Sequence, residues 1–174
     1  MLEHPGLDKN PHITQDQLSN IHNELYGWCL SRCGYDSTAA EDLLQEVYMA
    51  LISGKALFKQ ESSLKTFLFS VAQHIANNQF RKLKLGFKLV TQISNEEATD
   101  EDQTTTNANR QNDEIWQAVR SLPAKQRDIT ELVFYRELTI QEAAHIMGIT
   151  LGSARVHYQR AKQSLATKLG HAYT

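Results

Sequence analysis

The chain of 174 residues contains only two cysteines, Cys29 and Cys33. Two cysteines are too few for the framework of several disulfides that stabilises small secreted domains. They lie four residues apart on an expected helix, and His22 lies seven residues before Cys29. These three side chains make at most a partial metal site, because a closed zinc site takes four ligands and their spacing matches no zinc pattern. We expect no bound metal, and a pair of buried or half-buried thiols.

The sequence also lacks a long apolar run and a glycine-rich phosphate-binding loop. No stretch reaches the roughly 18 apolar residues that a membrane span needs. The first residues have no apolar core like that of a signal peptide, so we expect a soluble, cytoplasmic protein that does not insert into a membrane. The paired carboxylates on the expected helix 38–53 have no pocket or histidine partner beside them, and the sequence therefore predicts no catalytic residues, no cofactor and no small-molecule substrate.

A large excess of one charge is missing as well, since the formal net charge is −2. The charges are, however, unevenly distributed along the chain. Residues 1–94 carry nine basic and nine acidic side chains, residues 95–114 one basic and seven acidic, and residues 115–174 eight basic and four acidic. The acidic segment conceals a basic C-terminal third, which favours a nucleic-acid partner.

Apolar residues recur at helical spacing through most of the chain, and no run alternates as a strand does. Helices are expected from about Thr14, over residues 38–53 and 63–85, and again from residue 114. Thr38 and Glu41 form a capping box that predicts the start of the second helix. The buried stripe expected on the third helix consists of Leu64, Phe67, Leu68, Val71 and Ile75.

Residues 91–112 interrupt this helical pattern. They are polar, acidic and rich in threonine and asparagine, with too few apolar residues to offset the entropy of folding. The prediction is an all-α protein with two small helical domains, at 12–90 and 113–170, joined by a flexible acidic linker at 91–112.

Residues 139–169 carry the clearest signal of function. Thr139 and Glu142 form a capping box, and Gly148 stands where a helix needs a left-handed residue to end. A second helix, from Thr150 or Leu151, then has one apolar face and one cationic polar face. This is the pattern of a helix-turn-helix, whose second helix lies in the major groove of DNA. An ordinary helical hairpin with a solvated basic face is the alternative.

The first domain presents two further surfaces. On helix 38–53, acidic and amide side chains lie together off the apolar face, which suits protein docking better than DNA binding; a solvated helix face is the alternative. Helix 63–85 ends in amides, an aromatic ring and cations, the mixture that single-stranded nucleic-acid binders use. Phe58 and Phe80 are candidates for stacking on bases, with core packing as the other interpretation.

Two blocks of the sequence, at about 14–88 and 114–169, resemble bacterial RNA polymerase sigma factors of the extracytoplasmic-function (ECF) group of the sigma-70 family. AAEDLLQEVYMALI at 39–52 and SLKTFLFSVAQHIANNQFRKLK at 63–84 resemble the region that binds the polymerase and melts and reads the −10 element. The stretch 122–165, which contains the helix-turn-helix, resembles the region that reads the −35 element. Both blocks, in this order and separated by an acidic linker in a short chain, make the resemblance specific.

The resemblance implies a sigma factor that binds core RNA polymerase and promoter DNA, directs transcription initiation, and is held inactive by an anti-sigma factor. The polymerase-binding residues that it implies are Asp42, Leu43, Gln45 and Glu46. The loop LFKQESS at 57–63 matches the family loop that holds a base flipped out of the −10 element. For this loop and the helix after it, the implied −10 residues are Phe58, Lys59, Ser62, Lys65, His74, Asn77, Asn78, Arg81 and Lys82. The implied −35 residues are Ser153, Arg155, Val156, His157, Gln159, Arg160 and Lys162.

Some positions depart from the family pattern and leave the preferred promoter sequence open. His74 stands where many members have Asn, Phe67 where Trp is common, and Arg155-Val156-His157 where Lys/Arg-Ser-Arg is frequent. By side-chain chemistry, arginine suits guanine or phosphate, Gln159 adenine, and valine a thymine methyl group.

Two other classes of protein are weighed against a sigma factor. A two-domain transcriptional regulator would use its first domain to sense a ligand or bind a partner, but such a domain has no reason to carry the loop at 57–63. A recombinase would need a nucleophile or a cluster of metal-binding carboxylates, and the sequence offers neither.

Overall fold

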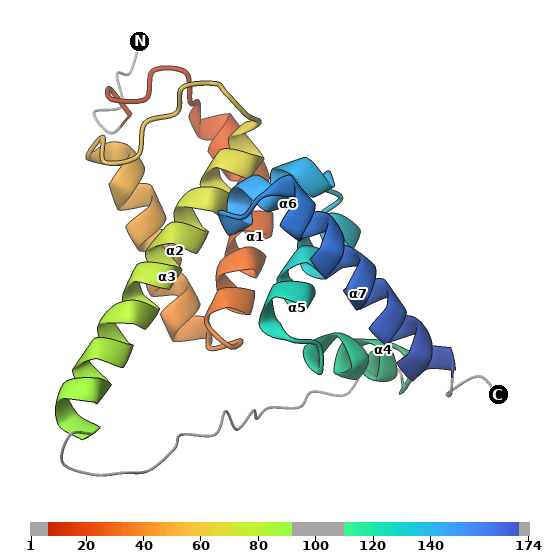
Figure 1. Ribbon diagram of the computed structural model, residues 1–174. Helices are drawn as coiled ribbons and strands as arrows, with labels where there is room; N and C mark the ends of the chain where they lie inside the picture. The colour runs from red at the N-terminus through yellow and green to blue at the C-terminus, as the bar shows by residue number, and fades with distance from the viewer. Residues whose placement is uncertain (1–6, 92–109, 171–174) are drawn as a thin grey trace. The chain divides into compact units, whose positions relative to one another are not determined.

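The computed structural model describes residues 7–91 and 110–170, with side chains for residues 7–83 and 114–170. The chain divides into two units, Met1–Asp102 and Gln103–Thr174. All regular secondary structure in the described residues is helical (Figure 1). The prediction of an all-α fold is therefore confirmed.

The N-terminal unit contains three helices, α1 (Gln15–Arg32), α2 (Ser37–Ile52) and α3 (Leu64–Thr91). Each helix packs against the other two. At the centre of the unit the ring of Trp28 stacks on Phe69, with centroids 5.6 Å apart, and its Nε1 donates a hydrogen bond to the Phe69 carbonyl at 3.2 Å. This contact fixes α3 against α1 and so positions the surface that α3 presents.

Helix α1 begins where the sequence predicts. Thr14 Oγ1 accepts a hydrogen bond from the Gln17 amide at 3.3 Å, and Gln17 Oε1 accepts one from the Thr14 amide at 2.9 Å. The two residues thus satisfy each other's backbone donors in a capping box.

The start of α2 differs from the prediction. Asp36, and not Thr38, caps the helix, with its Oδ1 accepting from the Ala39 amide at 3.1 Å. The predicted Thr38–Glu41 capping box is therefore wrong. The reason lies in the preceding turn, where Gly34 and the next residue both have left-handed backbone and bring Asp36 to the cap position.

Helix α3 is longer than expected, since it continues to Thr91. Its buried stripe is also displaced by about one residue from the predicted one. Leu68, Phe69 and Ala72 are fully buried, whereas Phe67 and Val71 are only half-buried. Because α3 packs against α1 and α2 together, its buried face is centred where Phe69 meets the aromatic ring on α1.

The C-terminal unit contains α4 (Arg110–Arg120), α5 (Ala124–Thr130), a π-helical turn (Glu131–Tyr135), α6 (Ile140–Met147) and α7 (Leu151–Gly170). Helix α7 packs against α4, α5 and α6. The buried apolar residues of the unit are alanine or aliphatic: Ala118, Leu122, Ile129, Leu132, Leu138, Ala143, Ala144, Ile146, Ala154 and Ala161.

The π-helical turn alters one expectation. The sequence predicts a helix that begins at Pro123 and carries Ile129, Leu132, Val133 and Tyr135 as its apolar residues. Ile129 and Leu132 are buried as predicted, but Tyr135 is 58% exposed. A π turn adds one residue per turn, which rotates the last side chains away from the core.

The predicted linker at 91–112 is shortened at both ends, because residue 91 and residues 110–112 belong to helices α3 and α4. The remainder of the linker lies outside the described residues. Within residues 7–91 and 110–170, no helix is long and apolar enough to span a membrane.

Candidate nucleic-acid interface

The helix-turn-helix of the C-terminal unit forms as the sequence predicts. Thr139 Oγ1 accepts from the Glu142 amide at 3.2 Å, and Glu142 Oε2 accepts from the Thr139 amide at 2.9 Å. Gly148 ends α6 in left-handed backbone with φ 63°. Helix α7 begins at Leu151, after Thr150, whose Oγ1 accepts from the Ser153 amide at 3.2 Å. Both helices of the motif are therefore fixed at the turn.

Helix α7 has the two faces that its sequence predicts. Ala154 and Ala161 are fully buried against the rest of the unit. The predicted contact residues lie on the other side, where all but His157, which is half-buried, are exposed: Ser153, Arg155, Val156, Gln159, Arg160 and Lys162. The result is a cationic, amide-bearing face of the kind that enters a major groove.

Ser153 and Lys162 have contacts near or within α7 that limit their freedom. The amide and hydroxyl of Ser153 both bond to Thr150, so this amide is engaged before any phosphate arrives. Lys162 Nζ lies 4.9 Å from the ring centroid of Tyr158, a cation–π contact on the exposed side of the helix. The exposed guanidinium groups of Arg155 and Arg160 are the strongest candidates for contact with bases.

Helix α3 carries a second polar face. Three residues, Asn77, Asn78 and Arg81, lie three, four and seven positions after His74, which places all four on one side of the helix. Gln73 Nε2 donates to Asn77 Oδ1 at 3.1 Å, and Arg81 Nη2 donates to Asn78 Oδ1. The amide groups are thus held in fixed orientations beside a cation.

The aromatic candidates on this unit differ in their surroundings. Phe58 is half-buried and packs on Phe67 of α3, with ring centroids 5.1 Å apart. Phe80 is 58% exposed, next to Arg81 on the outside of α3. Phe58 is therefore partly a packing residue of the core, whereas Phe80 is not part of the core.

The loop that precedes α3 presents the other predicted −10 residues. Lys59 is exposed and Ser62 is half-buried, with the Ser62 hydroxyl donating to the Ser63 carbonyl at 3.3 Å. Sequence reasoning missed one residue that shapes this loop, Asn10, which is 2% exposed and bonds to three backbone groups around it. No local pattern signals such a role, because its partners lie more than 40 residues away.

Helix α2 presents the predicted acidic ridge, which we define as Asp42, Gln45, Glu46 and Met49. All four side chains are exposed, Met49 by 62%. Leu43, which we expected among the polymerase-binding residues, is fully buried instead. This correction follows from helical geometry, because Leu43 lies next to Leu44 and four residues before Val47, on the side that packs into the core.

Comparisons with known proteins agree with this arrangement. The family models Sigma-70 region 2 and Sigma-70, region 4 match residues 19–85 and 112–165. The ECF RNA polymerase sigma factor SigX of Bacillus subtilis (strain 168) is 30% identical over 152 residues, which are 83% of this chain and 77% of that protein. The chain belongs to the ECF group of the sigma-70 family. As a sigma factor it is a transcription initiation factor and not an enzyme.

Two other relatives extend the likeness. RNA polymerase sigma factor YlaC, also of Bacillus subtilis (strain 168), is 24% identical, covering 87% of this chain and 91% of that protein. Among solved structures, the sigma factor RpoE from Bartonella quintana, in complex with the anti-sigma factor NepR, matches with a TM-score of 0.67 at 23% identity, covering 90% of this chain and 96% of that one. The structural match supports the sigma-factor fold.

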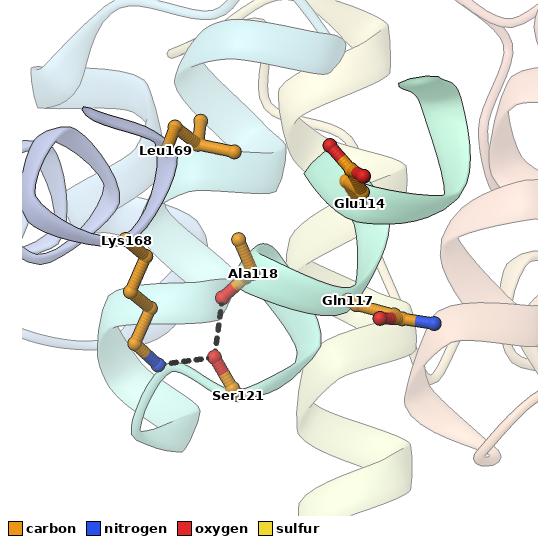
Figure 2. Close-up of a pocket in the computed structure, with 6 residues that line it drawn as sticks. All are labelled: Glu114, Gln117, Ala118, Ser121, Lys168 and Leu169. Atoms are coloured by element: carbon orange, nitrogen blue, oxygen red, sulfur yellow. Dashed lines mark hydrogen bonds between the residues drawn. The ribbon is translucent and has the colours of Figure 1, made fainter. Parts of the chain in front are cut away.

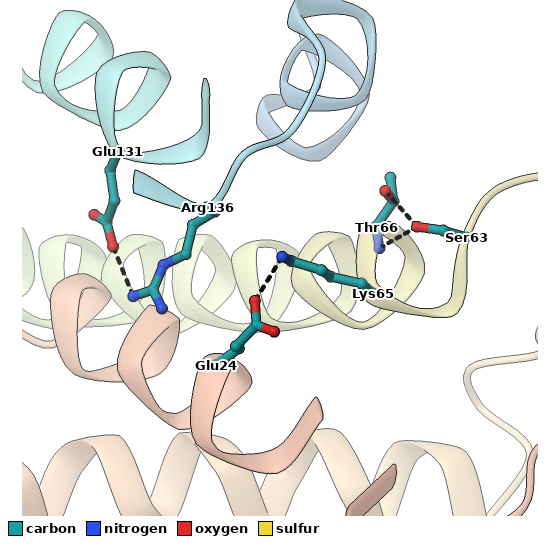
Figure 3. A network of polar contacts seen from close by, with 6 residues as sticks. All are labelled: Glu24, Ser63, Lys65, Thr66, Glu131 and Arg136. Atoms are coloured by element: carbon teal, nitrogen blue, oxygen red, sulfur yellow. Dashed lines mark hydrogen bonds and ion pairs between the residues drawn. The ribbon is translucent and has the colours of Figure 1, made fainter. Parts of the chain in front are cut away.

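Not every cation of this sigma factor is available to DNA. Figure 3 shows Lys65 Nζ directed at the Glu24 carboxylate, 2.5 Å away on α1. The same figure shows Arg136 paired with Glu131 at 3.1 Å in the C-terminal unit, where both side chains are about 90% buried. Arg136 is thus paired with a carboxylate of its own unit, which offsets part of the positive charge of the C-terminal third.

The thiols have the environment that we predicted for them. Cys29 is buried and Cys33 is half-buried. Burial, with a smaller effect of the Cys33 thiolate, raises the pKa of Cys29 to about 12. His22 Nδ1 lies 2.9 Å from the hydroxyl of Tyr48. Among the described residues, no three His, Cys, Asp or Glu side chains are grouped to hold a metal ion.

A shallow hollow lies where α4 and the end of α7 meet (Figure 2). Lys168 Nζ donates to Ser121 Oγ, and this hydroxyl donates to the Ala118 carbonyl at 2.7 Å. The bond between Lys168 and Ser121 joins α7 to the end of α4 within the unit.

Proposed function

We propose that this sigma factor binds core RNA polymerase through the acidic ridge of α2. The ridge is exposed, carries two carboxylates and an amide, and has the large apolar side chain of Met49 at its edge. An acidic surface repels DNA phosphates and suits a cationic protein partner. Leu43 supports this surface from the core and makes no contact of its own.

The N-terminal unit opens and holds the −10 element in this proposal. Cations, amides and the exposed ring of Phe80 lie along α3, and single-stranded DNA needs these three kinds of group. The loop at 57–63 holds an unpaired base, because an extruded base must regain the stacking and hydrogen bonds that it loses from the duplex. The ion pair of Lys65 with Glu24 makes this lysine a weaker candidate than Lys59 or Arg81.

The C-terminal unit reads the −35 element through α7. Arg155 and Arg160 contact guanine or phosphate, Gln159 adenine, and Val156 a thymine methyl group. His157 is a weaker phosphate partner, because imidazole is mostly neutral near pH 7. The acidic segment between the two units serves as the linker that lets both elements be held at once.

An anti-sigma factor is the inhibitory partner that we propose, acting in the cytoplasm. The solved relative from Bartonella quintana is in complex with an anti-sigma factor. Large apolar side chains exposed on both units, Met49 and Leu57 in one and Phe134 in the other, suit a partner that covers them.

One observation carries the proposal. Exposed faces that carry cations and amides lie on α3 in one unit and on α7 in the other, and these units match sigma regions 2 and 4 in that order. Permanganate footprinting tests it, because permanganate oxidises unpaired thymines. The non-template strand of a cognate promoter should become reactive near −10 only when core polymerase and this protein are both present. Reactivity with core polymerase alone, or protection of duplex DNA by this protein without opening, would contradict the proposal.

A further inference from the structure

A buried asparagine connects the first described residues to the loop at 57–63. The side chain of Asn10 is 2% exposed. Its Nδ2 donates to the carbonyls of Leu51 and Ala56, both at 2.9 Å, and its Oδ1 accepts from the Phe58 amide at 2.7 Å. Both amide hydrogens and the oxygen of one side chain are thus used on three backbone groups. Such a site is specific for asparagine, because no other small side chain offers this set.

The segment that carries Asn10 is itself anchored. The Asn10 amide donates to the Leu7 carbonyl at 2.8 Å, and the Ile13 amide donates to the Asn10 carbonyl at 3.0 Å. Ile13 is 4% exposed and belongs to the core. Gly54 has φ 73°, and a Cβ there would lie 3.0 Å from Cγ of Lys9, so the segment lies close against the end of α2.

The loop is held at Phe58 from two sides. Its backbone amide bonds to Asn10, while its ring packs on Phe67 of α3. Lys59 and Ser62 follow directly, before α3 begins at Leu64. Any loop conformation that broke the bonds to Asn10 would leave two carbonyls and an amide without these partners, which strongly disfavours it.

We infer that Asn10 is a positioning residue for promoter recognition: it fixes the backbone of Phe58 so that the loop is already shaped to receive an unpaired base. This inference rests on the proposed function of the loop. A preformed pocket binds its ligand without the entropic cost of ordering the loop, and it discriminates between bases because it cannot adapt to the wrong one. Asn10 touches no DNA and acts through the loop backbone.

Selection from a promoter library tests the inference. Core polymerase with the full chain transcribes a library randomised over both elements, and the base preference at each position is compared for wild type, Asn10→Ala and Val47→Ala. Val47 is fully buried on α2, so its substitution lowers the stability of the same unit without removing a bond to the loop. We expect the base preference of Asn10→Ala to weaken at one or two −10 positions, so that the four bases are used more equally there. Its −35 preferences should not change. Val47→Ala should keep both profiles.

The outcomes separate the inference from the proposed function. A wild-type profile with no −10 preference would overturn both. If the wild type shows a −10 preference and Asn10→Ala keeps it, the inference alone is overturned. The same holds if Asn10→Ala and Val47→Ala lose that preference to the same extent. Hydrogen exchange of the wild-type chain tests the contact without a variant: the Phe58 amide should exchange at least about tenfold more slowly than its unprotected rate. Exchange at the unprotected rate would remove the bond on which the inference depends.

Discussion

Arg155 is exposed near the start of α7, between the buried Ala154 and the exposed Val156. We predict that Arg155→Ala weakens binding to the −35 element by about 1–3 kcal/mol and relaxes the base preference at one position. The measurement is binding of the holoenzyme to duplexes that differ at single −35 positions. Lys168→Ala, which removes a cation from the far end of the same helix, should leave that preference unchanged.

A uniform loss of affinity on all sequences would assign Arg155 to a phosphate and not to a base. Equal effects of Arg155→Ala and Lys168→Ala would contradict the assignment of this face of α7 to DNA.

Cys29 gives a prediction about pH, because burial raises its pKa from 9.0 to about 12. Between these values the thiol of the unfolded chain is ionised while the folded thiol stays protonated. The folded state then binds more protons, so its stability falls as pH rises above about 9. From pH 8 to pH 10, the free energy of unfolding of the wild type should fall by about 1.4 kcal/mol more than that of Cys29→Ala.

Urea unfolding of wild type and Cys29→Ala at both pH values measures this difference. Groups common to the two proteins cancel in the comparison. A difference in unfolding free energy that stays constant from pH 8 to pH 10 would show that Cys29 ionises normally in the folded chain.

At the scale of single residues, exposure could be predicted wherever the helical period is clear. Hydrogen-bond partners could not be predicted. The exposed and buried sides of α7 follow from its sequence, but Leu43 was expected on a surface and is buried. Asn10 and the Arg136–Glu131 pair were missed. Asn10 finds its partners through the folded arrangement of its unit, and an arginine in a basic segment gives no sign that it is paired internally.

At the scale of elements, the turn between α6 and α7 depends on one backbone conformation. Gly148 has φ 63° and nothing within 4 Å of where a Cβ would stand, so Gly148→Ala meets only backbone strain. We predict a loss of about 1–2 kcal/mol in unfolding free energy. Gly152→Ala, inside the first turn of α7, should instead gain about 0.5–1 kcal/mol by helix propensity.

Thermal unfolding of the two glycine variants measures these opposite shifts. If both variants shifted the midpoint in the same direction, the left-handed end of α6 would not govern the stability of the helix-turn-helix.

The acidic ridge of α2 gives a second prediction at this scale. Asp42→Arg should weaken binding to core polymerase about tenfold or more, because it reverses a charge on a surface that we assign to a cationic partner. Binding of the full chain to a −35 duplex should not change. Asp16→Arg, the same charge reversal on the exposed first turn of α1, is the control.

Fluorescence anisotropy of labelled chain, titrated in turn with core polymerase and with the −35 duplex, gives both affinities. If Asp42→Arg binds core polymerase with the same affinity as Asp16→Arg, the ridge does not bind polymerase.

The ends of helices could be predicted where residues close in the sequence determine them. The start of α1 near Thr14, the capping box at Thr139 and the glycine end at Gly148 depend on neighbouring residues, and all three are found where the sequence predicts them. The start of α2 was missed because a left-handed pair of residues shifts the cap to Asp36. The π-helical turn depends on packing of its unit, which no short stretch of sequence reveals.

At the scale of the whole molecule, neither unit alone identifies the function. The helix-turn-helix by itself indicates duplex DNA binding, and a three-helix unit with an acidic ridge by itself indicates very little. Their combination, with the amide and cation face on α3, supports our proposal that one surface binds polymerase and two bind promoter DNA. The net charge of −2 conceals this arrangement, because acidic and basic surfaces lie in different parts of the chain.

Transcription in vitro from a randomised promoter library tests the central claim most directly. With purified core polymerase and this protein, transcripts should start from a selected set of promoters that share two sequence elements at constant spacing, near −10 and −35. Core polymerase alone should not select them. Absence of selected starts, with the chain nevertheless binding one duplex site by itself, would contradict the account and favour a two-domain transcriptional regulator.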